Sequence, residues 1–329
     1  MDFEHAPAYW RFLRRGTTIY CAFQLDRRQR SSQGAGKSPN FRRRASRDRP
    51  MNLKTLKETA PWNWPEGTDQ VLLSVLTNSS ESEADRLLAA ELASDLAVVN
   101  ATLVDALLAL IADAQEGEAL RGQAAISLGP VLELCDMDGF EEPSEVPITQ
   151  ELFGQVQSKL KQLYFDGVVP KEVKRRILEA SSRAAAEWHH DAIHQAFLSG
   201  DPNWQLTSVF CMGYVGGFDA EILKALTSNN PAIQYLAISA AGVWEVQAAW
   251  PHVLGRLVAD DTEKPILLAA IDAVASLRPK EAQEVLSDLL DSEDDDIAEA
   301  AGEAIGMAEE RLKGHTEDDE AISGDGTLN

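Results

Sequence analysis

The feature that most constrains the fold is a pattern of apolar and small residues that recurs about every thirty residues. Each copy begins with an apolar residue, and apolar or small residues follow four, eight and nine positions later, on one stripe of a helix. The ninth position is Gly, Ser or Ala in every copy, so a second helix can approach closely there. The copies begin at Leu120, Val173, Trp204, Ile233, Ile266 and Ile297. Such a repeat predicts a stacked helical array.

Another helix precedes each stripe, and the residues between the two are typical of turns and helix caps. Asp, Asn and Ser accept hydrogen bonds from the first N–H groups of a helix, and Pro suits its first turn. These turns fall at residues 200–202, 229–231, 260–262 and 292–295. No part of the repeated region predicts a strand. Because one helix pair cannot bury its apolar stripe alone, we expect an all-α fold, an α-solenoid of about seven stacked antiparallel helix pairs.

Two motifs carry a resemblance to a known family. The first runs from Leu120 to Gly129, and the second from Asn230-Pro231-Ala232-Ile233 to Ala240-Ala241-Gly242. They resemble the HEAT repeats, in particular the short PBS-lyase-like HEAT repeats, over about residues 66–310. The resemblance implies a right-handed superhelix of helix pairs. It leaves the function open, because such solenoids serve many roles.

The first fifty residues differ from the rest in charge. They contain 12 Lys+Arg and 4 Asp+Glu, a net charge of +8, whereas the remainder has a net charge of −31. Three interpretations compete for residues 1–50. They are a basic arm that binds nucleic acid or folds back on the acidic body, a transit peptide, or an extension upstream of a true start at Met51. Asp2 and Glu4 disfavour the transit peptide, because such segments contain few acids.

The remaining boundaries follow from composition. We expect an N-terminal cap segment over 51–65, the solenoid over 66–312, and a disordered acidic tail over 313–329. An acidic loop over 136–150 interrupts the repeats. Its Asp136-Met137-Asp138-Gly139 stretch lacks the third ligand and the terminal Glu of a calcium loop, so a plain surface loop is expected.

Charge and composition exclude several classes of protein. The whole chain has a formal net charge of −23, which disfavours binding of nucleic acid by the folded body. No apolar stretch is long enough to predict a membrane span. The three cysteines show no CxxC spacing, which favours a reducing compartment, and we expect a cytoplasmic protein.

One histidine cluster invites a metal hypothesis. His190 and His194 share a helix face at a spacing that zinc accepts, with Asp191 as a further candidate ligand. The alternative is a polar helix face that packs on Trp188 or Trp204. We predict no metal, no cofactor and no catalytic residue, because glycine-rich phosphate loops, a serine elbow and a paired-cysteine motif are also missing from the sequence.

The resemblance also suggests enzyme branches to weigh. Deoxyhypusine hydroxylase is built on His-Glu pairs, and this sequence contains no His-Glu dipeptide. The HEAT-like DNA glycosylases use a basic groove, which the acidic body contradicts. The phycobilin lyases and related chromophore- or cofactor-handling proteins stay open as an alternative function.

The favoured function is a non-enzymatic interaction scaffold. The second helices of such solenoids line the concave groove, and one stripe beside their buried stripe is apolar in the middle of the array and acidic at its end. It would bind a basic or amphipathic segment of a partner protein. Its candidate residues are Leu206, Phe210, Tyr235, Leu268, Asp272, Glu299 and Glu303. The competing interpretation places Leu206, Phe210 and Leu268 in the core between repeats.

Overall fold

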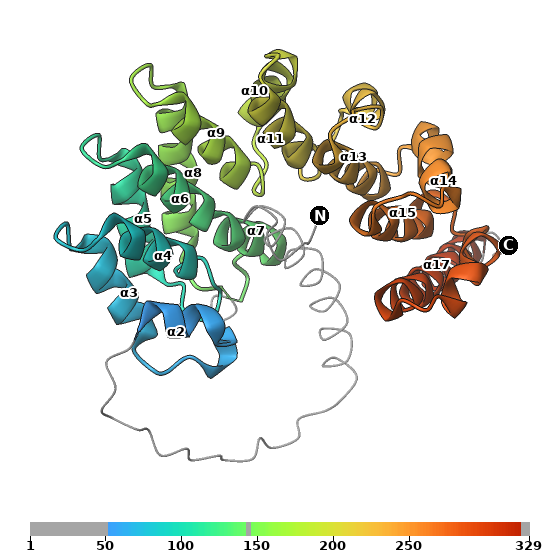
Figure 1. The fold of residues 1–329 in the computed structure, drawn as a ribbon, viewed down its shortest axis with the longest axis horizontal. Coiled ribbons are helices and arrows are strands. Elements are labelled where there is room, and N and C mark those ends of the chain that lie inside the picture. The colour runs from blue at the N-terminus through green and yellow to red at the C-terminus, as the bar shows by residue number, and fades with distance from the viewer. Residues whose placement is uncertain (1–51, 143–145, 324–329) are drawn as a thin grey trace, which may run out of the picture. The chain divides into compact units, whose positions relative to one another are not determined.

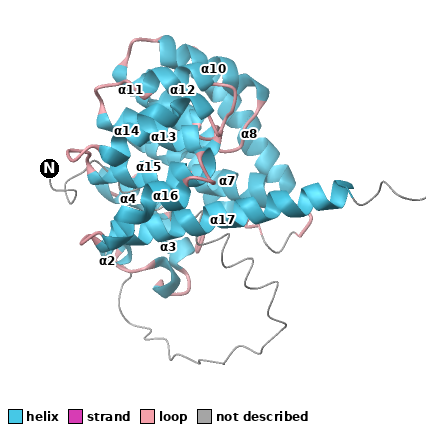
Figure 2. Ribbon diagram, turned by 90° about the vertical axis from the view of Figure 1, so that its right-hand side faces the viewer, coloured by secondary structure: helices cyan, strands magenta, loops and turns pink. Residues whose placement is uncertain are grey.

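A computed structural model describes residues 52–142 and 146–323, with side chains described up to residue 313. The expectations for residues 1–50, for the start at Met51 and for residues 324–329 lie outside the described residues. Within the described ranges every regular element is helical, so the predicted all-α fold is confirmed (Figures 1 and 2).

Within the described residues the helices form seven consecutive antiparallel pairs, the number expected. Each pair is a first helix, a short turn and a second helix, and in Figure 1 the second helices lie on the inner side of the row. The pairs are α3 (Thr68–Thr77) with α4 (Glu83–Leu92), α5 (Ala101–Ala112) with α6 (Glu118–Ser127), α8 (Gln150–Phe165) with α9 (Lys171–Ser181), α10 (Glu187–Leu198) with α11 (Pro202–Met212), α12 (Asp219–Ala225) with α13 (Pro231–Val243), α14 (Trp250–Val258) with α15 (Lys264–Leu277), and α16 (Ala282–Leu286) and η4 (Ser287–Asp291) with α17 (Asp295–Ser323).

Second helices pack on one another in chain order, from α4 to α17. The small ninth position of the repeat permits the contact between α13 and α15. A Cβ atom added to Gly242 would lie 3.2 Å from the Cα atom of Ala273, so a side chain there would require the two backbones to move apart by a few tenths of an ångström. The interior between the two rows of helices consists mainly of Leu, Ile, Val and Ala side chains, with one cluster in the N-terminal pairs and another in the last pairs.

Polar contacts also repeat along the array. The Arg86 and Arg121 side chains each donate to a backbone carbonyl ten residues earlier, at the end of the first helix of their own pair. These bonds satisfy carbonyl groups that a helix end leaves without partners. At the same, N-terminal end of other second helices, Lys171 pairs with Asp201 at 2.8 Å and Lys264 pairs with Asp294 at 2.6 Å. Each of these lysines thereby joins the N-terminus of one second helix to the N-cap of the next.

A short segment precedes the first pair. It contains α2 (Leu53–Glu58) and the turn η2 (Pro61–Asn63). Leu53 and Leu56 are buried, and α2 packs on α4. The indole Nε1 of Trp64 donates to the Leu56 carbonyl at 2.9 Å, which fixes the turn, while Trp62 is 83% exposed.

Two expected boundaries need correction. Residues 136–138 belong to an additional helix, α7 (Gly129–Asp138), which packs on α6 and α9 and buries Val131, Leu132 and Cys135. The loop therefore begins at Gly139, because these apolar side chains hold the chain helical until then. At the other end, α17 continues to Ser323, so residues 313–323 extend a helix instead of beginning an irregular tail. Figure 2 shows this helix running past the rest of its pair.

Candidate partner-binding face

The residues predicted to bind a partner all lie on the second helices α11, α13, α15 and α17. They form three groups: the acidic residues are exposed, the two leucines and the tyrosine are half-buried, and the phenylalanine is buried. The groups are Asp272, Glu299 and Glu303, then Leu206, Leu268 and Tyr235, and finally Phe210.

Phe210 is part of the packing between pairs. Its side chain is only 5% exposed, and its ring centroid lies 5.3 Å from that of Tyr214. The Arg183 guanidinium carbon lies 5.4 Å from the Phe210 centroid. Because other side chains of the same protein cover the ring, Phe210 lies in the core between repeats, which was the competing interpretation of this residue. It is therefore removed from the candidate surface.

Arg183 joins three parts of the array, a role that the sequence did not reveal. Its side chain is 9% exposed, and its Nη1 donates to Glu133 of α7 at 2.6 Å. The guanidinium also lies 5.3 Å from the Tyr214 ring. Burial raises the pKa of Tyr214 to about 12, although the Arg183 charge opposes the shift. Tyr214 therefore stays neutral, and its ring face can hold the cation.

On α9, the positions that correspond to Leu206 and Phe210 of α11 are occupied by Arg175 and Glu179, which belong to a buried cluster of charged side chains. Arg175 and Glu179 lie 3.7 Å apart, and Arg176 approaches Glu179 to 3.1 Å. Arg175 also donates to the Thr207 hydroxyl at 2.6 Å, which connects α9 to α11. Burial raises the pKa of Glu179 even though three arginines oppose it. These charges are matched inside the chain, so this part of the stripe offers little to a partner.

Asp272 has a different setting. Its side chain is exposed, and yet the surrounding protein atoms and the charge of Glu303 on α17 raise its pKa to about 6. Within the described ranges, no cation forms an ion pair with Asp272, Glu299 or Glu303. The carboxylates at the acidic end of the stripe are therefore exposed, and those of Asp272 and Glu303 repel each other.

The raised pKa of Asp272 predicts a pH-dependent gain in stability for Asp272→Asn. The folded state binds this proton more tightly than the unfolded chain, so ionisation of Asp272 costs stability as pH rises from about 4 to about 6. At pH 7 the variant should gain about 0.5–1 kcal/mol, after allowance for solvent screening. At pH 3 it should gain nothing. Urea denaturation at both pH values measures this, with the outer-row variant Asp288→Asn as control; an equal gain at both pH values would contradict the prediction.

The histidines of α10 make separate contacts. His190 stacks on Phe218 with a centroid distance of 4.5 Å, and the His194 Nδ1 lies 3.0 Å from the Glu221 carboxylate. His189 is buried beside Trp188, and burial lowers its pKa to about 4, so its ring is neutral. Among the described residues, no group of three or more His, Cys, Asp or Glu side chains is arranged to hold a metal ion.

The two described cysteines are unsuited to nucleophilic chemistry. Both are buried, and neither forms a disulfide. Burial raises the pKa of Cys135 to about 11, and it raises that of Cys211 further. The thiolate, which is the nucleophilic form, is therefore scarce at both positions at neutral pH.

One family model matches part of the array, in the last three helix pairs. The family described as HEAT repeats matches residues 220–306, from α12 into α17. The resemblance to HEAT repeats is confirmed over these residues, which include the second of the two sequence motifs and the three exposed carboxylates of the stripe.

Several solved structures are similar to about three quarters or more of this chain. YibA of Escherichia coli has 15% identity and a TM-score of 0.44, and the alignment covers 81% of this chain and 89% of YibA. Human deoxyhypusine hydroxylase in complex with glycerol has 16% identity and a TM-score of 0.34, with 74% of this chain and 97% of the enzyme covered. An engineered protein has 15% identity and a TM-score of 0.37, with 73% and 78% covered. These TM-scores are too low to carry an argument about activity.

No match to this chain was found among curated proteins. In the described part of the chain, none of the helices has the length and apolar character needed to cross a bilayer.

Proposed function

We propose that this chain is a non-enzymatic scaffold that binds a basic amphipathic segment of a partner protein on the second-helix face of α13, α15 and α17. The observation that carries the proposal is the open acidic end of the stripe. Asp272, Glu299 and Glu303 are exposed, and within the described residues they have no cationic partner. A Lys or Arg side chain of a partner would relieve the repulsion between Asp272 and Glu303.

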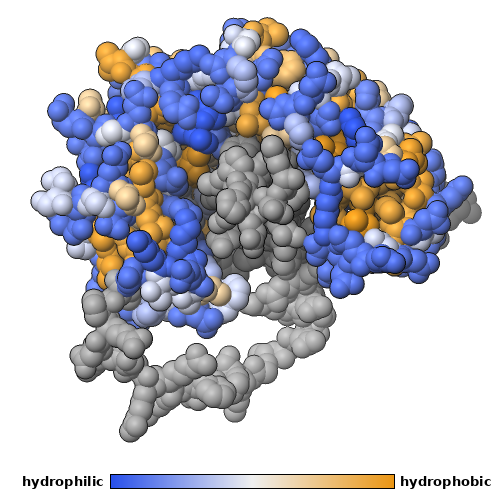
Figure 3. Space-filling view, in the orientation of Figure 1, coloured by the Kyte–Doolittle hydropathy of each residue, from blue (hydrophilic) through white to orange (hydrophobic). Residues whose placement is uncertain are grey.

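The same face offers apolar contacts beside the carboxylates. Leu268 lies one helical turn before Asp272 on α15, and Tyr235 lies on the neighbouring α13; both are half-buried. Figure 3 shows hydrophobic surface around α15 with hydrophilic side chains over α17 next to it. An apolar patch with a charged border suits a segment that has one apolar side and one basic side.

The charge of the chain supports a cationic partner. A formal net charge of −23 attracts basic segments over a distance of about one Debye length, roughly 8 Å at physiological salt. The same field repels polyanions, so we propose no nucleic-acid partner for the folded body. Association should therefore weaken as salt is added.

An enzymatic role has less support. The described thiols are buried, and the sequence contains no His-Glu dipeptide, so we do not extend the hydroxylase activity of the human neighbour to this chain. No observation favours the lyase-like alternative. Two buried, unpaired cysteines fit a reducing compartment, and we propose the cytoplasm as the place of action.

Affinity capture from the native cell with the full chain tests the proposal. The double variant Asp272→Asn/Glu303→Gln should recover much less of the partner than the native chain. A segment of that partner, measured by calorimetry, should bind the variant at least about tenfold more weakly, since about 1.4 kcal/mol is lost with two charge contacts.

The matched control removes two exposed acids from the outer row of the last pair. Glu284→Gln/Asp288→Asn changes the net charge by the same amount, and both residues are exposed on α16 and η4. It should bind as the native chain does. If both double variants bound the partner equally weakly, only the net charge of the chain would matter for binding. If neither variant bound more weakly, the partner would not bind on this face.

A further inference from the structure

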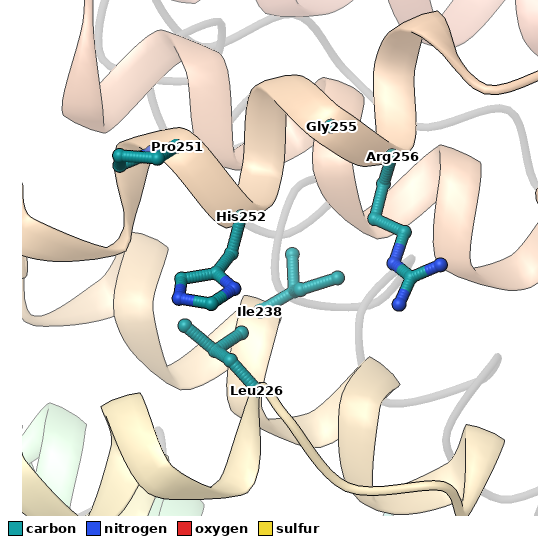
Figure 4. A pocket seen from close by; sticks show the side chains of 6 residues that line it. All are labelled: Leu226, Ile238, Pro251, His252, Gly255 and Arg256. Atoms are coloured by element: carbon teal, nitrogen blue, oxygen red, sulfur yellow. The ribbon is translucent and has the colours of Figure 1, made fainter.

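A hollow of about 220 Å³ opens on the outer row, away from the acidic stripe. Three elements form it: the end of α12, the middle of α13, and α14. Its floor consists of Leu226 and Ile238, which are 4% and 1% exposed. Figure 4 shows these two side chains directed toward α14, with His252 and Arg256 extending from α14 on either side of Ile238.

The rim carries two nitrogen-rich side chains. His252 and Arg256 are one helical turn apart, so they project from the same face of α14. Among the described residues, neither side chain is part of an ion pair or a hydrogen bond; only the Arg256 backbone carbonyl accepts one, from Thr262. An uncompensated guanidinium beside an apolar floor is unusual in a chain with a net charge of −23.

Gly255 also lines the hollow. It lies inside α14, where glycine is less favourable than alanine. A Cβ atom added there would meet no atom within 4 Å, so no close backbone contact requires the glycine. Larger side chains would project into the hollow or its mouth. The space, its apolar floor and the unpaired cation are therefore three separate observations at one place.

We propose that this hollow binds a small organic monocarboxylate. The apolar group of the ligand lies on Leu226 and Ile238, and its carboxylate pairs with the Arg256 guanidinium, whose planar fork matches two carboxylate oxygens. The His252 imidazole can donate a further hydrogen bond. A single negative charge fits better than a phosphate dianion, because the acidic chain repels a dianion more strongly. This site is independent of the partner-binding face.

Methyl NMR on the full chain tests the proposal. Leucine and isoleucine methyl groups are observed while benzoate, benzamide or inorganic phosphate is added. Benzoate should shift the methyl signals of Leu226 and Ile238 saturably. Benzamide, which is neutral and of similar shape, and phosphate should leave them in place.

Three variants complete the test. Arg256→Gln should weaken benzoate binding at least tenfold, and Gly255→Leu should abolish it while the other methyl signals keep their positions. Lys280→Gln removes one positive charge at an exposed position outside the hollow and should bind benzoate as the native chain does. Equal shifts with benzamide or phosphate, unchanged affinity in Arg256→Gln, or no saturable shift with benzoate would overturn the proposal.

Discussion

Replacing Arg183 with methionine is expected to lower the free energy of unfolding by about 3–5 kcal/mol, because it breaks a largely desolvated ion pair and leaves one charge behind. Arg183 pairs with Glu133 at 2.6 Å and lies over the rings of Phe210 and Tyr214. Methionine keeps much of the length of the side chain and removes the charge. Urea denaturation followed by circular dichroism measures the loss.

A double-variant cycle separates the charge from the packing. Glu133→Gln added to Arg183→Met should recover part of the loss, because it removes the unpaired carboxylate. A loss below about 1 kcal/mol in the single variant, the range of an exposed ion pair, would show that Arg183 does not join these helices.

Gly242→Leu is expected to destabilise the array by about 2–3 kcal/mol or more. A Cβ atom at Gly242 would lie 3.2 Å from the Cα atom of Ala273 and 3.3 Å from its Cβ. The neighbour is backbone, so it cannot turn aside as the end of a long side chain could. Helices α13 and α15 must then separate, with the loss expected of an overpacked core. Thermal unfolding gives the size of the effect.

Gly306 provides a matched control at the same repeat position on α17. A Cβ atom there would meet nothing within 4 Å, because α17 is the last second helix of the described array. Gly306→Leu should therefore change stability by less than about 1 kcal/mol, and Gly306→Ala should gain about 0.5–1 kcal/mol from the lower entropy of the unfolded chain. If Gly242→Leu were as harmless as Gly306→Leu, close helix approach would not explain the small position.

These two glycines show why the fold could be predicted from the sequence. Stacking imposes the same packing on each pair, so the small ninth position and the caps recur in the sequence. Helix α7 could not be predicted in this way, because it occurs once. Its start at Gly129-Pro130 is typical of a turn.

The candidate site was predictable only in part. Asp272, Glu299 and Glu303 are exposed because their stripe lies beside the buried one, which helical spacing alone indicates. The buried Phe210 ring lies beside the Arg183 guanidinium, and Arg183 pairs with Glu133, fifty residues earlier in the chain. Contacts between residues so distant leave no local signal. The hollow beneath α14 likewise joins residues from three elements.

Carboxyl footprinting tests the central claim most directly. The full chain is labelled with a carbodiimide and an amine, with and without the captured basic segment, and each labelled carboxylate is quantified by mass spectrometry. Labelling of Asp272, Glu299 and Glu303 should fall when the segment is bound, while labelling of Glu284 and Asp288 should stay the same. Unchanged labelling of the first three, or protection confined to the outer-row pair, would contradict the claim.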